Sequence, residues 1–287
     1  MSHFWTNYHS HNYYCDGVES PEAQVQAAIQ QGVQTFGFSS HCPVPFTNGW
    51  SMKRDRLDEY LSEARALKEK YRGSIELYVG LEIDYIPGVC GPADFADQLD
   101  YTIGSVHYLG TNWNGEPWEI DGATEGFMKG LVEVHDGDIE GVLRQYYALL
   151  RQMVQQDRPD VVGHLDKIKI HNIQGSLYDE ESDWYKAEID QTLDAIAEAG
   201  CIVEVNTRGV YKKTLDIYPS EAILKRMRER DIPIMINSDS HTPAEITLAF
   251  VDTAHQLRQI GYKMVRVLVQ NEWKDIPFDK DGLSLGN

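Results

Sequence analysis

Two histidines near the N-terminus, His9 and His11, are separated by one residue and followed by Asp16. Side chains alternate between the two faces of an extended strand, so His9 and His11 point to the same side. Neutral imidazoles presented in this way can bind one divalent metal ion, and a nearby carboxylate such as Asp16 is a further ligand. Such a pair alone is more often structural. What favours a metal site is that similar residues recur along the chain.

Histidines and acids stand at the ends of most strands that the sequence predicts, and six of the ten histidines fall at these positions. The candidate metal ligands are His9, His11, Asp16, His41, Glu82, His107, His164, Asp239 and His241. This set exceeds the needs of one tetrahedral site, so we predict two or three ions, with Glu82 or Asp239 as a bridge. Mixed imidazole and carboxylate ligands suit Zn, Mn or Fe and do not discriminate between them.

The elements that must position these residues alternate along the chain as strand and helix. Predicted strands lie at 4–9, 35–39, 75–83, 101–107, 160–164, 201–206 and 233–238, with a peripheral strand at 265–269. Predicted helices lie at 21–31, 54–71, 139–156, 184–199, 219–230 and 244–260. The strands are apolar throughout, which is typical of a parallel sheet covered on both faces. We therefore predict an α/β fold with a closed parallel barrel, and a doubly wound open sheet is the alternative.

In a parallel α/β barrel the C-terminal ends of the strands meet at one face, where active sites lie. The candidate ligands would converge there. Residues 109–135 break the strand and helix pattern and contain Gly, Asn, Trp and acids, so we predict an irregular active-site loop. We expect a single domain that spans residues 1–287.

Composition excludes several classes of partner. The formal net charge of −19 argues against nucleic acid, whose phosphates need Lys and Arg. The chain has no run of about 18 apolar residues, so we expect no membrane span. The N-terminus lacks the pattern of a signal peptide, and the four cysteines show no disulfide-dense or CxxC spacing. We expect a cytoplasmic protein with a small-molecule substrate, and the oligomeric state stays open.

Several motifs carry a resemblance to a known family. They are the HxH pair with the following CDG, then SSHCPVP, GLEIDY, IGSVH, VVGHLDKIK, EVNTRG and INSDSH. In order and spacing these motifs resemble the PHP family of metal-dependent phosphoesterases, and within it the histidinol-phosphate phosphatases. The resemblance extends from about Tyr8 to Ala254. It implies a distorted (β/α)7 TIM-like barrel with a trinuclear metal centre.

The resemblance also implies a role for each ligand. His9, His11, Glu82 and Asp239 would hold the first metal ion. Glu82 would bridge to a second ion, which His107 and His164 complete. Asp16, His41 and His241 would hold the third.

The reaction that the resemblance implies is hydrolysis of L-histidinol phosphate to L-histidinol and phosphate, a step of histidine biosynthesis. A hydroxide that bridges two metal ions would attack phosphorus in line. Arg208 immediately follows a strand end, and we expect its guanidinium to bind the phosphate. Lys167 or Lys169 is a weaker candidate for a second cation. His41, Asp16 or a metal-bound water could protonate the leaving alkoxide.

The leaving group of this substrate carries an ammonium and an imidazole, so its pocket should offer acids and aromatic rings. The segment 113–127 has this composition, and Glu119 and Trp118 are its candidate substrate contacts.

Three alternatives remain at this stage. The first is a PHP phosphoesterase that acts on another small phosphate monoester. The second is a non-catalytic metal-binding module, although a decayed site would have lost ligands. The third is a metal-dependent amidohydrolase barrel, which often has a carboxylated Lys where this chain has Glu82.

Overall fold

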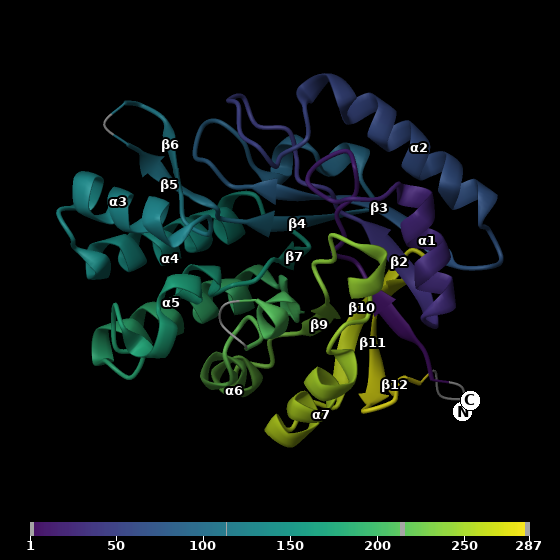
Figure 1. Cartoon of the computed structure of the whole chain (residues 1–287). Coiled ribbons are helices and arrows are strands. Elements are labelled where there is room, and N and C mark those ends of the chain that lie inside the picture. The colour runs from purple at the N-terminus through teal and green to yellow at the C-terminus, as the bar shows by residue number, and fades with distance from the viewer. Residues whose placement is uncertain (1–2, 113, 213–215, 285–287) are drawn as a thin grey trace.

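Seven parallel strands form a nearly closed barrel in the computed structural model of the protein, which describes residues 3–112, 114–212 and 216–284 (Figure 1). In sheet order they are β1 (Trp5–Asn7), β2 (Val33–Phe38), β3 (Glu76–Asp84), β4 (Tyr101–Ser105), β7 (Val161–Val162), β8 (Ile202–Asn206) and β9 (Ile234–Asn237). The edge strands approach each other beyond their C-terminal ends, where the His11 amide donates to the Ser240 carbonyl at 2.7 Å.

The order of the strands in the sheet follows their order in the chain. A doubly wound sheet requires this order to reverse partway. The predicted barrel is therefore confirmed and the open-sheet alternative is wrong.

Helices cover the outside of the barrel (Figure 1). They are α1 (Pro21–Gln30), α2 (Leu57–Lys70), α3 (Thr124–His135), α4 (Ile139–Gln156), α5 (Asp183–Ala199), α6 (Glu221–Glu229) and α7 (Phe250–Ile260). Most lie close to their predicted bounds, because caps such as Ser20, whose Oγ accepts from the Ala23 amide, are visible in the sequence. The last helix is shorter than predicted. Ala249 adopts a left-handed backbone with φ 64°, so α7 begins only at Phe250.

The segment 109–135 is more regular than the irregular loop that we predicted. It contains an antiparallel hairpin of β5 (Tyr108–Thr111) and β6 (Pro117–Glu119), followed by α3. Glycines in this segment made its helix hard to predict, and at least one of them has a structural role. A Cβ at Gly130 of α3 would lie 2.1 Å from Nε1 of Trp118, so the glycine makes room for the indole.

A second small sheet closes the other end of the barrel. It consists of β10 (Met264–Val269), β11 (Glu272–Asp279) and β12 (Gly282–Leu283), and all its pairs are antiparallel. β10 confirms the predicted peripheral strand, whereas β11 was not expected. The Tyr8 hydroxyl, beneath the metal-ligand candidates, donates to the Leu268 carbonyl at 2.7 Å and ties this sheet to β1.

Tyrosine side chains fill the interior of the barrel under its C-terminal end. Tyr8 and Tyr101 are at most 1% exposed, and their rings meet edge to face at 5.8 Å. The Tyr101 hydroxyl donates to the carbonyls of Tyr8 and Phe38 at 2.5 and 2.9 Å. A Cβ at Gly37 would lie 2.3 Å from this hydroxyl, so the glycine is required for the ring to fit. Tyr101 thus links three barrel strands directly below the candidate site.

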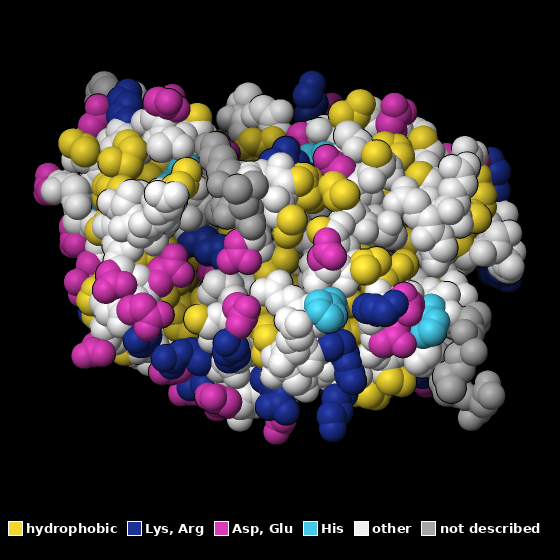
Figure 2. Space-filling model, turned by 60° about the horizontal axis from the view of Figure 1, so that its bottom comes forward, with side chains coloured by type: hydrophobic (Ala, Val, Ile, Leu, Met, Phe, Trp, Pro, Cys, Tyr) yellow, Lys and Arg dark blue, Asp and Glu magenta, His cyan; other side chains and the backbone are white. Residues whose placement is uncertain are grey.

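Acidic and basic side chains are interspersed over the face of the molecule shown in Figure 2. The net charge of −19 is therefore not confined to one patch of that face. Among the described residues, none of the helices is both long enough and apolar enough to cross a membrane.

We predict that Tyr101→Phe lowers the free energy of unfolding by about 1–3 kcal/mol, because two buried carbonyls lose their donor. Urea unfolding measures this change. The matched control is Tyr85→Phe, whose hydroxyl is only partly buried and donates to Gln156. Equal losses for the two variants would show that Tyr101 does not have this linking role.

Candidate metal centre

All nine predicted ligands lie at the C-terminal end of the barrel. His9, His11 and Asp16 follow β1, His41 follows β2, Glu82 lies in β3, His107 follows β4, His164 follows β7, and Asp239 and His241 follow β9. The parallel strands bring them together because their C-terminal ends meet at this face. Their donor atoms form three groups.

The first group consists of His9, His11, Glu82 and Asp239. The Nε2 atoms of His9 and His11 lie 3.1 and 3.4 Å from Glu82 Oε2. The same two atoms lie 3.8 and 3.1 Å from Asp239 Oδ1. Donors that bind one tetrahedral zinc at about 2.0–2.1 Å are about 3.3–3.4 Å apart. The first group therefore has the spacing of a metal site.

The second group uses the other oxygen of the same carboxylate. Glu82 Oε1 lies 2.8 Å from His164 Nε2 and 3.5 Å from His107 Nε2. The two Nε2 atoms are 3.4 Å apart. Glu82 thus stands between the first and second groups, where a bridging carboxylate would lie.

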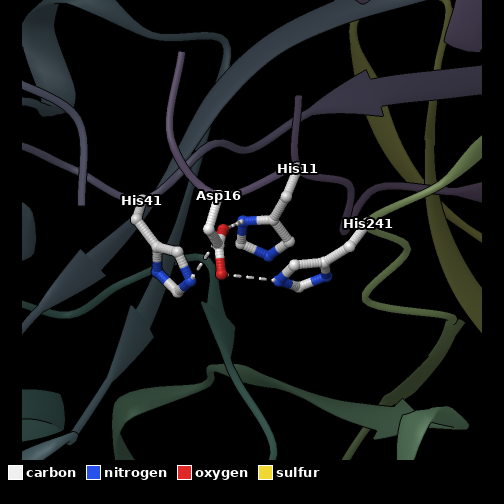
Figure 3. Close-up of side chains that lie close together, drawn as sticks. All are labelled: His11, Asp16, His41 and His241. Atoms are coloured by element: carbon white, nitrogen blue, oxygen red, sulfur yellow. Dashed lines mark hydrogen bonds and ion pairs between the residues drawn. The ribbon is translucent and has the colours of Figure 1, made fainter. Parts of the chain in front are cut away.

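The third group surrounds Asp16 with three imidazoles (Figure 3). Asp16 Oδ2 lies 3.1 Å from His241 Nε2, and Oδ1 lies 3.9 Å from both His41 Nε2 and His11 Nδ1. His41 also presents Nδ1 to Glu82 Oε2 at 3.0 Å. The His41 ring therefore stands between the third group and Glu82.

Several of these donor atoms lack hydrogen-bond partners among the described residues. They are Nε2 of His9, Nε2 of His11, Nδ1 of His41 and Oε2 of Glu82, all of them buried. The three nitrogens surround the one oxygen at 3.0–3.4 Å without hydrogen-bond geometry. A buried polar atom without a partner costs about 1–3 kcal/mol. Divalent metal ions would satisfy all four atoms, so the residues present fit such ions.

The electrostatics of the cluster keep its carboxylates ionised. Burial opposes the charge of Glu82, but the imidazoles of His41 and His9 hold its pKa well below the usual range. Burial likewise opposes the charge of Asp239, and here His9 and Arg208 hold the pKa well below the usual range. Metal ligands must be deprotonated, so these carboxylates are in the form that binds a cation.

Two further acids contact the candidate ligands and were not predicted. Asp84 Oδ1 lies 2.8 Å from His107 Nδ1, and Glu204 Oε1 lies 2.6 Å from His9 Nδ1. Asp84 stands two residues after Glu82 in β3, and Glu204 stands two residues before Asn206 in β8. Because strand side chains alternate, Asp84 faces the same side as Glu82, and Glu204 the same side as Asn206. This alternation is the feature of the sequence that could have identified both acids.

A cavity of about 270 Å³ opens over the three groups. Its wall includes Arg208, Lys167, Trp50, Glu119 and Asp121. The Arg208 guanidinium is only 15% exposed and donates to the Asp239 carbonyl at 2.8 Å. The cavity therefore offers two cations, two acids and an indole, and one of the cations, Lys167, lies beside the acid Asp121.

Two predicted substrate contacts do not reach this cavity. Lys169 is buried, lies 3.2 Å from Asp166, and donates to the Ile217 carbonyl at 2.9 Å. Trp118 is 5% exposed and stacks on Phe127 at 5.4 Å. Both side chains support the surrounding structure and neither lines the cavity, so their role as substrate contacts stays a prediction that this geometry does not favour.

Lys167 and Glu119, by contrast, line the cavity as predicted for substrate contacts. Trp113, the first residue of the predicted substrate loop, lies outside the described residues.

A parallel barrel with three groups of imidazoles and carboxylates at its C-terminal end belongs to the class of metal-binding α/β barrels. The profile of the PHP domain matches residues 7–208. Because this match covers more than half of the chain, the protein belongs to the PHP family, and the predicted membership is confirmed.

Proteins of known name are similar over nearly the whole chain. The "Probable histidinol-phosphatase" of Deinococcus radiodurans is 31% identical over 269 residues, which cover 90% of this chain and 94% of that protein. The "Histidinol-phosphatase" of Bacillus subtilis is 27% identical over 269 residues, with coverage of 84% and 95%.

Solved structures share the fold. A HisK protein from Listeria monocytogenes aligns with a TM-score of 0.74 at 20% identity, over 86% of this chain and 99% of that chain. The histidinol phosphate phosphatase of Lactococcus lactis, solved with zinc, L-histidinol and phosphate, aligns with a TM-score of 0.64 at 19% identity, over 99% and 100% of the two chains.

We predict that zinc added back to chelator-treated protein raises the melting temperature, because an ion that binds only the folded state stabilises it by about 2.7 kcal/mol at about 100-fold excess over Kd. The rise should be smaller for His107→Ala, which removes one ligand of the second group. The control is His255→Ala, on the exposed face of α7. Equal rises for both variants would contradict a role of His107 in metal binding.

Proposed function

We propose that this protein hydrolyses L-histidinol phosphate to L-histidinol and inorganic phosphate, a step of histidine biosynthesis. The observation that carries the proposal is that one cavity is lined by members of all three ligand groups. Two cations, Arg208 and Lys167, and two acids, Glu119 and Asp121, line the same cavity. A metal centre suits the phosphate, and acids suit a cationic leaving group. Relatives of similar length that are named histidinol-phosphatase support this choice of substrate.

Three divalent ions, each Zn, Mn or Fe, would occupy the three ligand groups. One ion would be held by His9, His11, Glu82 and Asp239. A second would be held by Glu82, His107 and His164, and a third by Asp16, His41 and His241. When bound, such ions lower the pKa of water and neutralise phosphoryl oxygens. The protein supplies the fixed geometry, because every ligand extends from the end of a barrel strand or from the loop that follows it.

Arg208 and Lys167 are the residues that we propose to bind the phosphate. The Arg208 guanidinium is held by the carbonyl of Asp239, itself a proposed ligand, so phosphate bound to it would lie beside the metal centre. A guanidinium matches two phosphate oxygens at once, and charge-assisted bonds of this kind are strong. Lys167 Nζ lies 3.7 Å from Asp121 Oδ2, which restrains the ammonium at the cavity wall.

Glu119 and Asp121 form the proposed subsite for the leaving group. Both acids line the cavity, and burial together with the neighbouring charge of Asp121 raises the pKa of Glu119. An ammonium or imidazolium placed between them would relieve this repulsion. Trp50 offers an aromatic ring in the same cavity, and its own ring lies 4.4 Å from that of His41.

The leaving alkoxide needs a proton. His41 and Asp16 border the cavity beside the metal-ligand groups. We propose them as candidate donors for the state in which they do not hold the third ion, because a metal ligand must be deprotonated.

We further propose that residues 1–287 act as one catalytic domain. The C-terminal sheet is tied into the barrel, since Leu283 and Phe4 exchange two backbone hydrogen bonds. All four cysteines are free thiols, which suits a reducing compartment such as the cytoplasm.

The test is phosphate release from L-histidinol phosphate compared with glycerol phosphate, a nucleoside monophosphate and phosphotyrosine, using metal-loaded protein. We expect a marked preference for L-histidinol phosphate. Turnover of the other esters alone would contradict the proposed substrate but retain the chemistry. The absence of metal-dependent turnover on any ester would indicate a binding module.

Arg208→Met should lower kcat/KM for L-histidinol phosphate about 100- to 1,000-fold, because a fixed donor to the phosphoryl group is lost. Steady-state kinetics measure this effect. Arg266→Met, which removes a surface ion pair with Asp275, is the control and should change kcat/KM little. A loss in Arg208→Met no larger than in the control would remove Arg208 from the mechanism.

Asp121→Asn should raise KM for L-histidinol phosphate about 10-fold, because the charge that faces the cationic leaving group is lost. Hydrolysis of glycerol phosphate, whose leaving group is neutral, should change far less. Parallel losses on both esters would show that Asp121 acts on the phosphate through Lys167, and would contradict its role in recognising the leaving group.

A further inference from the structure

Glu204 is a buried acid at the centre of the barrel that receives four hydrogen bonds. Its side chain is 0% exposed and lies in β8, below the metal-ligand groups. Oε1 lies 2.6 Å from His9 Nδ1 and accepts from Asn237 Nδ2 at 3.0 Å. Oε2 accepts from the His164 amide and from Asn206 Nδ2, both at 2.9 Å.

The partners of Glu204 require a carboxylate. Three of them, the two asparagine Nδ2 groups and the backbone amide, can only donate. An ionised carboxylate is an acceptor at about four positions, whereas an amide offers one acceptor oxygen and one donor nitrogen. Since His9 Nδ1 fills the fourth position at hydrogen-bond distance, we assign the proton of the His9 ring to Nδ1. The Nε2 atom of His9 then carries an unshared electron pair, which faces Glu82 and Asp239.

Glu204 reaches two of the three ligand groups at once. Through the ring of His9 it orients a ligand of the first group, and through the backbone amide of His164 it holds a ligand of the second. Asp84, by comparison, lies at hydrogen-bond distance from the ring of His107, in the second group. Among the described residues, the four hydrogen bonds of Glu204 go to His9, His164, Asn206 and Asn237, and none goes to the third group around Asp16.

We propose that Glu204 is a positioning residue that sets the metal affinity of the first and second groups together, by fixing the His9 tautomer and the place of His164. The inference rests on the proposed metal centre. Acids that orient a metal-binding histidine typically contribute about 10- to 100-fold to metal affinity. The effect on the third group should be small, and this selectivity separates positioning from a general loss of structure.

The test is the isosteric variant Glu204→Gln, in which an amide nitrogen must face a donor. Metal content per chain is measured by mass spectrometry, and zinc affinities by competition with chelators. The matched control is Glu188→Gln. Glu188 is another buried glutamate, which lies in α5 outside the barrel and pairs with Arg144 and Arg151 of α4. We expect two zinc affinities to fall about 10- to 100-fold in Glu204→Gln, with the third retained, and no change in the control.

The outcomes are separable. Wild-type protein without bound metal would refute the metal centre itself. Wild-type affinities in Glu204→Gln, or an equal loss at all three sites, would refute the role of Glu204 alone. If Glu204→Gln does not fold, long-range ¹H–¹⁵N spectra of histidine-labelled wild-type protein decide the matter. His9 protonated at Nδ1 supports the proposal, and His9 protonated at Nε2 overturns it.

Discussion

The buried carboxylate of Glu82 is the group on which the rest of the site depends. It is 1% exposed, and its two oxygens face different groups of imidazoles. A buried charge is costly unless partners neutralise it. Here the partners are histidines that follow several different strands. A parallel barrel brings these residues together, because the C-terminal ends of its strands meet at one face. The fold and the proposed chemistry therefore share a single constraint, which is to assemble compensating groups around one buried acid.

Asp239 connects this cluster to the proposed phosphate-binding residues. Its backbone adopts φ 52°, a left-handed conformation that Asp tolerates better than most residues. The side chain faces His11, while the carbonyl accepts from Arg208. Asp239 therefore fixes the position of the Arg208 guanidinium relative to the first group of proposed metal ligands. Beneath them, Tyr101 of β4 reaches across the barrel interior to the carbonyls of Tyr8 and Phe38, so the floor of the site is built from the barrel interior itself.

Much of this organisation could be predicted from sequence, because the candidate ligands stand at strand ends or in the loops that follow them, and strand ends are local signals. The side chains whose positions depend on contacts with residues distant in the sequence could not be predicted. Lys167 and Lys169 look equivalent in sequence, but they lie on a short 3-10 helix (Lys167–His171), where residues two apart point in different directions. Lys169 consequently turns toward Asp166. Trp118 is buried by α3. This helix was not predicted, because it contains glycines, which are unfavourable in helices.

Anomalous diffraction from crystals grown with zinc and phosphate would locate the proposed ions and the bound anion. We predict metal peaks at about 2.0–2.2 Å from the donor atoms of the three groups, with one oxygen of Glu82 at the first group and the other at the second. We also predict phosphate in contact with Arg208. Metal peaks elsewhere, or a site in which Glu82 binds no metal, would contradict the proposed metal centre.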